Sequence, residues 1–94
     1  MSNVDTYLTG VFRGHGSWVI NITGMKGINR HSKVVASITE VTNAPGGPLD
    51  YPFHGSASMF VMNVVPYDNG TVDFWLQVNW DSILNLRMAI YVSN

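Results

Sequence analysis

The chain has 94 residues, a formal net charge of −1, no cysteine and a charged fraction of only 12%. This length suits a single domain of on the order of 100 residues, and the net charge creates no field that would attract nucleic acid or an anionic membrane. The absence of cysteine excludes disulfide bonds and thiolate metal sites. We therefore expect one domain spanning residues 1–94, with a surface solvated mainly by neutral polar side chains.

The amino-terminal segment has no charged stretch followed by an apolar run, which is the pattern that directs secretion. It begins Met1-Ser2-Asn3. No apolar run in the chain approaches the ~20 residues that a membrane-spanning helix needs. We expect a soluble protein without a membrane span, either cytoplasmic or released without a signal.

Alternating β-branched and aromatic residues between turn-forming clusters predict strands throughout the chain and no helix. In chain order, strands are expected at residues 6–13, 17–23, 33–42, 56–65, 71–80 and 83–92. Residues 43–55 hold three of the four prolines, which indicates a long connection. The predicted fold class is all-β: a small antiparallel β-sandwich or partly closed barrel of about six strands, with a C-terminal three-stranded meander.

The strongest turn signal is Asn69-Gly70, because both residue types tolerate the positive φ angles of a type I′ hairpin turn. With these two as the loop residues, one face of the hairpin is almost entirely apolar and is predicted to be core. This register pairs Tyr67 with Val72, Val65 with Phe74, Asn63 with Leu76, Val61 with Val78 and Met59 with Trp80.

The last strand is predicted to pair with residues 71–80 through a three-residue loop at 81–83. A two-residue loop would turn Arg87 into the core and expose the alternating apolar residues of this strand. The longer loop brings Leu84 beside Trp80 and Leu86 beside Val78. Trp80 and Trp18 are both expected in the core.

The opposite face of this predicted meander is amphipathic and centred on Trp75. The polar and aromatic residues expected to share that face are Asp73, Gln77, Asn79, Arg87 and Tyr91. Aromatic patches with polar rims usually mark interaction surfaces. Three interpretations remain open: the first three strands cover the face, it is a homo-oligomer interface, or it is a platform for a ligand.

Catalytic and metal-binding patterns are missing from the sequence. The histidines His15, His31 and His54 stand in separate polar or glycine-rich segments without the spacing of metal ligands. No serine, histidine and acid occur in the setting of a known nucleophile motif. We expect no enzyme activity, no catalytic residue, no cofactor and no metal site.

The function that best fits these observations is a non-catalytic, lectin-like binding module. It would recognise a neutral glycan or similar polar ligand through Trp75 and its polar neighbours, as a homo-oligomer. The segment Pro45–Gly55 would complete the site through Tyr51, Phe53 and His54. The alternative is a self-assembling structural or virion-associated protein that uses the same face as a subunit interface. Nucleic acid is not expected as a partner, because basic residues near aromatic ones are few.

Overall fold

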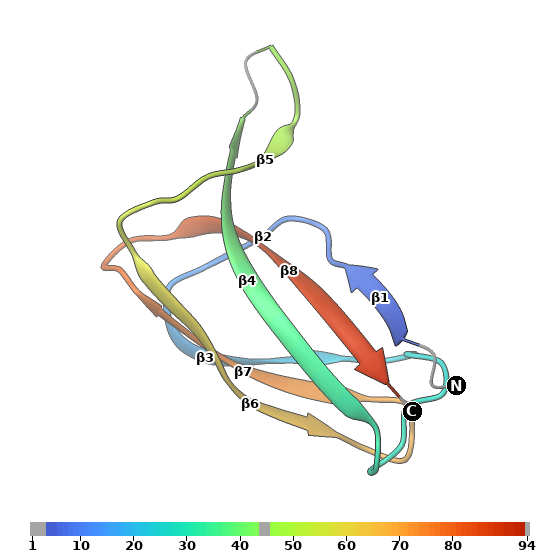
Figure 1. Cartoon of the computed structure of the whole chain (residues 1–94). Coiled ribbons are helices and arrows are strands. Elements are labelled where there is room, and N and C mark those ends of the chain that lie inside the picture. Colours follow the sequence, from blue (N-terminus) through green and yellow to red (C-terminus); the bar gives the residue numbers. More distant parts are fainter. Residues whose placement is uncertain (1–3, 44–45, 94) are drawn as a thin grey trace.

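The computed structural model describes residues 4–43 and 46–93, and within these ranges it is all-β, as predicted (Figure 1). Pro45, which the sequence placed in the candidate loop, lies outside the described residues. No helix in the described ranges is long and apolar enough to cross a membrane. The strands are β1 (Val4–Leu8), β2 (Phe12–Gly14), β3 (Gly16–Ile22), β4 (Lys33–Asn43), β5 (Leu49–Pro52), β6 (Ser58–Pro66), β7 (Val72–Asn79) and β8 (Leu84–Ser93).

These strands form two antiparallel sheets that pack face to face. The larger sheet has the order β1-β8-β4-β5, and β2 follows β1 along the same edge of β8. The smaller sheet has the order β3-β7-β6. The hairpin of β4 and β5 extends beyond the two layers (Figure 1).

The core lies between β7 and β8, the central strands of the two sheets. Alternate residues of each strand point inward and are essentially inaccessible to solvent: Val72, Phe74, Leu76 and Val78 on β7, and Leu86, Met88, Ile90 and Val92 on β8. Burying a large apolar side chain contributes about 1.5–3 kcal/mol, so these two strands supply much of the driving force for folding. Trp18 of β3 packs against the same cluster, which confirms its predicted core position.

The predicted pairing of the last two strands is wrong. β7 and β8 do not form a hairpin, because the chain crosses from the small sheet to the large one between them. The Trp80 N–H donates to the carbonyl of Val78 at 2.9 Å, which reverses the chain at the end of β7. Trp80 is consequently 42% exposed instead of buried in the core.

The hairpin of β6 and β7 exists, but its predicted turn and register are wrong. Gly70 has a φ of 81° while no non-glycine residue in the described ranges has a positive φ, so Asn69 does not adopt the type I′ conformation. The Gly70 N–H donates to the Tyr67 carbonyl, and the Tyr67 N–H donates to the Thr71 carbonyl. This is a three-residue loop with a glycine bulge, which shifts the register by one residue.

An irregularity at Met62 then shifts the register of β6 a second time. Val64 pairs with Phe74 on one side of the shift, and Val61 pairs with Leu76 on the other. The turn has already reversed Val64 and Val65, so Val64 packs against the core and Val65 is exposed, opposite to the prediction. The irregularity at Met62 reverses the facing again, so Val61 points inward as predicted. A bulge of this kind exchanges the faces that a strand presents.

Two other segments differ from prediction in detail. The expected first strand is divided into β1 and β2, which are separated by residues 9–11 and pair with successive parts of β8. The connection at 43–55 contains β5, so it is a hairpin arm and not an unstructured loop.

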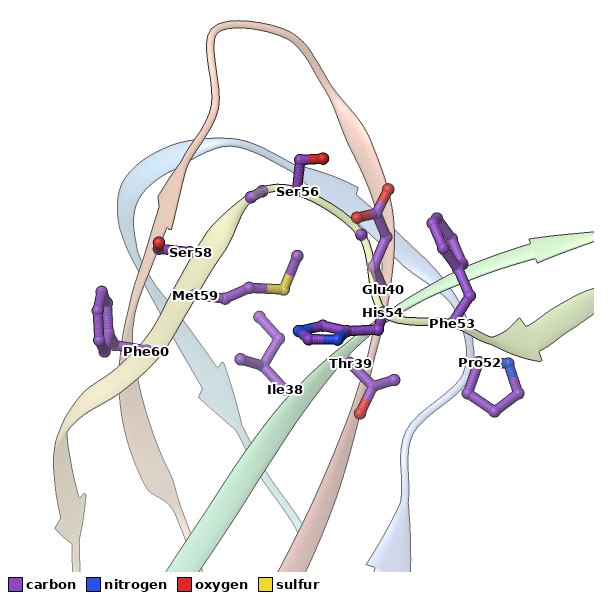
Figure 2. A pocket seen from close by; sticks show the side chains of 12 residues that line it. Ile38, Thr39, Glu40, Pro52, Phe53, His54, Ser56, Ser58, Met59 and Phe60 are labelled. Carbon is purple, nitrogen blue, oxygen red and sulfur yellow. The ribbon is translucent and has the colours of Figure 1, made fainter.

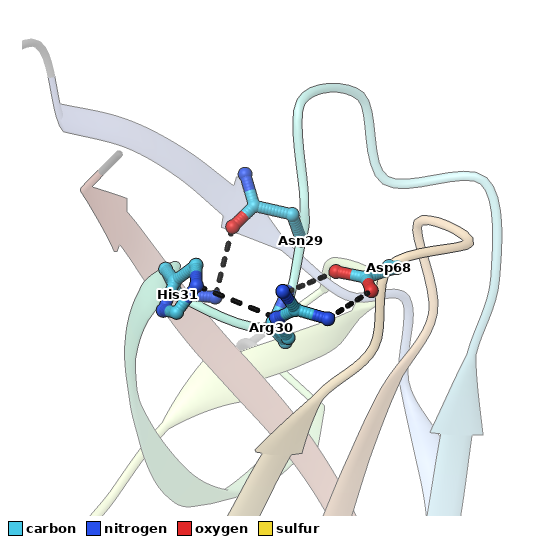
Figure 3. A network of polar contacts seen from close by, with 4 residues as sticks. All are labelled: Asn29, Arg30, His31 and Asp68. Atoms are coloured by element: carbon cyan, nitrogen blue, oxygen red, sulfur yellow. Dashed lines mark hydrogen bonds and ion pairs between the residues drawn. The ribbon is translucent and has the colours of Figure 1, made fainter.

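The loop at 23–32 joins the two sheets at one end and is hydrogen-bonded to the β6–β7 turn (Figure 3). The Met25 N–H donates to the Gly70 carbonyl at 3.0 Å. The Arg30 N–H donates to Asp68 Oδ1 at 2.9 Å, and its guanidinium lies 3.4 Å from Oδ2. The loop also places Met25 and Ile28 in the core, so it closes that end of the sandwich.

Candidate functional site

The outer face of the small sheet carries Trp75 at its centre, 43% exposed. Its neighbours across the strands are Val19 of β3 and Asn63 of β6. The indole Nε1–H donates to Oγ of Ser17 at 2.6 Å. Because Ser17 pairs with Gln77, the next outward-facing residue of β7 after Trp75, the indole extends diagonally along the sheet toward β3. The hydrogen bond fixes the ring while leaving part of it open to solvent.

Asp73 lies on the same face and accepts two hydrogen bonds. Asn21 Nδ2 donates to Oδ1 at 2.5 Å, and the Tyr67 hydroxyl donates to Oδ2 at 2.8 Å. The bonds from Asn21 and then Tyr67 hold the pKa of Asp73 below its ordinary value. The bond to Asp73 raises the pKa of the Tyr67 phenol. The network joins β3, β7 and the β6–β7 turn beside Trp75.

On the other side of Trp75 the face is polar and uncharged. Gln77 Nε2 donates to Oδ1 of Asn79 at 2.7 Å. Their partners on β6 are Phe60 and Ser58, respectively. Within the described part of this face, Asp73 carries the one charge, and the other polar groups are amides and hydroxyls.

Large apolar side chains surround these polar groups. Apart from Trp75, the exposed apolar residues on the outer face are Val19, Phe60, Met62 and Val65. The small sheet thus presents a continuous amphipathic surface, called the Trp75 face below: Ser17, Val19 and Asn21 of β3, Ser58, Phe60, Met62, Asn63 and Val65 of β6, and Asp73, Trp75, Gln77 and Asn79 of β7. The interpretation in which the first three predicted strands cover this surface is wrong. The strands β1, β2 and β4 belong to the large sheet on the inner side, and β3 is part of the small sheet itself.

A groove of about 640 Å³ opens next to the Trp75 face (Figure 2). It lies where the segment after β5 passes between the ends of β4 and β6. Phe53, His54 and Glu40 line it together with Ser56, Met59 and Phe60. Phe60 belongs both to the groove and to the Trp75 face and is 52% exposed.

Comparison with protein-family models, curated proteins and solved structures gave no match. The geometry of the site therefore carries the functional argument. Among the described residues, no three His, Asp or Glu side chains are grouped as metal ligands would be.

The structure separates the predicted site residues into four places. Asp73, Trp75, Gln77 and Asn79 lie together on the Trp75 face. Arg87 and Tyr91 alternate with the buried residues of β8, so they point to the opposite outer surface of the molecule. Their predicted place beside Trp75 is wrong, because it depended on pairing β7 with β8.

The three aromatic residues predicted from the connecting segment are also divided. Phe53 and His54 line the groove, whereas Tyr51 pairs with Thr42 in the projecting hairpin and is not part of the groove lining. The predicted contribution of this segment therefore lies beside the Trp75 face and not on it.

Sequence reasoning missed the partners that β3 and the turn supply. Ser17 and Asn21 alternate with core residues in the sequence, so their outward direction was readable from the period-two pattern. Their position beside β7 could not be read from that pattern, because Asn21 lies 52 residues from Asp73 and Ser17 lies 58 residues from Trp75 in the sequence. Tyr67 was assigned to the core by the incorrect register.

Proposed function

We propose that the protein is a non-catalytic binding module that recognises a neutral glycan on the Trp75 face. The observation that carries the proposal is the indole of Trp75, held by Ser17 Oγ at 2.6 Å and still 43% exposed. A fixed aromatic ring loses little conformational entropy when a ligand stacks on it. Carbon-bound hydrogens on one face of a sugar ring suit such a surface, because they meet the electron-rich face of the indole.

The polar surroundings of Trp75 favour a neutral ligand. Gln77 and Asn79 offer amide donors and acceptors on one side, and Asp73 offers a carboxylate on the other. Amides and carboxylates bond the hydroxyl groups of a sugar in fixed directions. An anionic ligand would be repelled by Asp73, and the described residues of this face include no cation to offset that repulsion.

A glycan array followed by titration of the best neutral hits tests this proposal. Trp75→Ala should weaken binding by about tenfold or more, as expected for loss of stacking worth on the order of 1–3 kcal/mol. The matched control is Trp80→Ala, because Trp80 is equally exposed at 42% but lies outside the Trp75 face. Absence of binding to every neutral glycan, or equal losses for the two variants, would contradict the proposal.

A second function is favoured by a different observation, the free edge of β3. The other sheet edges are protected by features that hinder pairing: Pro52 in β5, the bulge at Met62 in β6, and the interruption between β1 and β2. β3 has seven residues without charge, proline or bulge, and its described pairing is with β7 alone. We propose, as the alternative, self-assembly in which a second copy pairs with this edge.

Light scattering over a range of protein concentrations tests the alternative. Pairing of two β3 edges would bring Val19 of each copy close to its counterpart, so Val19→Lys should shift the wild-type oligomer toward monomer through like-charge repulsion. Val35→Lys is the control, because Val35 is equally apolar and exposed but lies on the large sheet. A wild-type protein that remains monomeric at high concentration would exclude self-assembly.

A further inference from the structure

The groove beside the Trp75 face is continuous with it. Along β7, the outward residues after Trp75 are Gln77 and Asn79, and their β6 partners are Phe60 and Ser58. Both β6 residues also line the groove. A ligand that extends from Trp75 in this direction would reach Phe60 after roughly 7 Å and Ser58 after roughly 13 Å, the lengths of two and four strand residues.

Glu40 provides the negatively charged group of the groove. It lies near the end of β4, where its backbone carbonyl accepts a hydrogen bond from the Phe53 N–H at 3.1 Å. Its side chain is half-buried, and its carboxylate lies against Gly55, where a Cβ would collide with Oε1. The backbone bond positions the end of β4, and the absence of a side chain at Gly55 leaves room for the carboxylate.

The rest of the groove supplies apolar and hydroxyl groups. Phe53 and Phe60 are both exposed, while Ser56 and Ser58 offer hydroxyls. His54 adds an imidazole to the lining of the groove (Figure 2). Aromatic rings next to a carboxylate and hydroxyls repeat the chemistry of the Trp75 face, in a concave setting that encloses more of a ligand.

We propose that this groove is a second subsite for the same glycan chain, with Glu40 accepting hydrogen bonds from the hydroxyls of a sugar unit distant from Trp75. This inference rests on the proposed glycan-binding function and specifies its ligand. The protein would bind the interior of a linear, neutral oligosaccharide, and a single sugar would occupy the Trp75 subsite alone. A uronic acid or sulfated unit would be rejected from the groove by the charge of Glu40.

The dependence of binding affinity on the length of the oligosaccharide tests this subsite. The probes are neutral β-1,4-linked oligomers of glucose and of N-acetylglucosamine, from one to six rings, titrated by calorimetry against the full chain. Wild-type affinity should rise by about tenfold or more between the shortest oligomers that bind and the longest, because added rings enter the groove. Glu40→Gln should remove most of that gain, since bonds to a charged acceptor are about twice as strong as neutral ones.

Two further variants separate the role of Glu40 from general effects. Gly55→Ala should displace the Glu40 carboxylate and reduce the length dependence while leaving the shortest oligomers unaffected. Asp5→Asn removes the same charge from β1, outside both the groove and the Trp75 face, and should change nothing. Thermal unfolding of each variant checks that it is folded.

The outcomes distinguish the two proposals. Length-independent binding that is lost in Trp75→Ala would overturn the groove subsite and leave the Trp75 function intact. Length-dependent binding that persists unchanged in Glu40→Gln and Gly55→Ala would also overturn it. If no oligomer of any length binds wild-type protein, both proposals fail.

Discussion

The indole of Trp18 lies directly against the backbone of Gly14. A Cβ placed on Gly14 would be 2.6 Å from both Cζ2 and Cη2 of the ring, far closer than van der Waals contact allows. Gly14 pairs with Leu84 in the large sheet, whereas Trp18 pairs with Leu76 in the small sheet. The contact therefore joins the two sheets at the corner where the chain passes from β2 to β3.

Substitution of Gly14 should destabilise the protein for a steric reason. Gly14→Ala is expected to cost about 1–3 kcal/mol, the usual effect of overpacking a core, as measured by urea unfolding. Gly10→Ala is the matched control, because no atom lies within 4 Å of a Cβ at that position, and its effect should be within about 0.5 kcal/mol. The penalty at Gly14 should shrink in a Trp18→Leu background; an unchanged penalty there would show that the ring is not its cause.

The β6–β7 turn predicts unequal effects of substitution at its two central residues. Gly70 has a φ of 81°, so Gly70→Ala should cost about 1–2 kcal/mol. Asn69 has no positive φ, and Asn69→Ala loses only the bond from the Thr71 N–H to Oδ1 at 3.2 Å, worth about 0.5–1 kcal/mol. Equal losses of unfolding free energy at the two positions would favour a type I′ turn instead.

Asp68 and Arg30 form an exposed ion pair, but their roles are not equivalent. Exposed pairs contribute little, so Arg30→Ala should change the unfolding free energy by less than about 0.5 kcal/mol. Asp68→Ala should cost more, roughly 1 kcal/mol, because Oδ1 also accepts the Arg30 backbone N–H at 2.9 Å and so holds the loop. Thermal or urea unfolding of both variants, with Lys26→Ala as the control in the same loop, measures the difference. A greater loss for Arg30→Ala would contradict this assignment.

The fold class and most strand positions were predictable because the residues alternate with a period of two. Every strand except β5 overlaps a predicted segment, and β1 and β2 share the first of these segments. The pairing of β7 with β8 was not predictable in the same way. An apolar face on each of two successive strands is buried equally well when the strands lie side by side in one sheet or face each other in two.

The candidate site shows the same limit at the level of single residues. Trp75 stood out because a tryptophan alternates with core residues and is flanked by Asp73 and Gln77. Its fixed orientation depends on Ser17, which the register of β3 brings beside it. Arg87 was included in error because one wrong strand pairing carries every outward side chain of that strand to the wrong surface.

The hydrogen bonds to Asp73 predict a specific dependence of stability on pH. The donors Asn21 and Tyr67 lower the pKa of Asp73 below its ordinary value of 3.8, so in the window below that value the unfolded chain binds more protons than the folded one. The stabilisation is therefore fully present above the ordinary value and is lost as pH falls through the lowered, folded-state pKa. In urea unfolding between about pH 2 and pH 7, the difference between wild type and Asp73→Asn should vanish at the acidic end.

Removal of one donor tests the cause of that dependence directly. Tyr67→Phe deletes the bond to Oδ2 and leaves the bond from Asn21, so the pKa of Asp73 should move part of the way back toward 3.8. Carboxyl carbon chemical shifts, followed by NMR during an acid titration, report this pKa. Tyr91→Phe removes a hydroxyl from the opposite outer surface and should leave the titration of Asp73 unchanged. An Asp73 titration that is identical in wild type and Tyr67→Phe would mean that the phenol does not stabilise the carboxylate, and the low pKa would then rest on Asn21 alone.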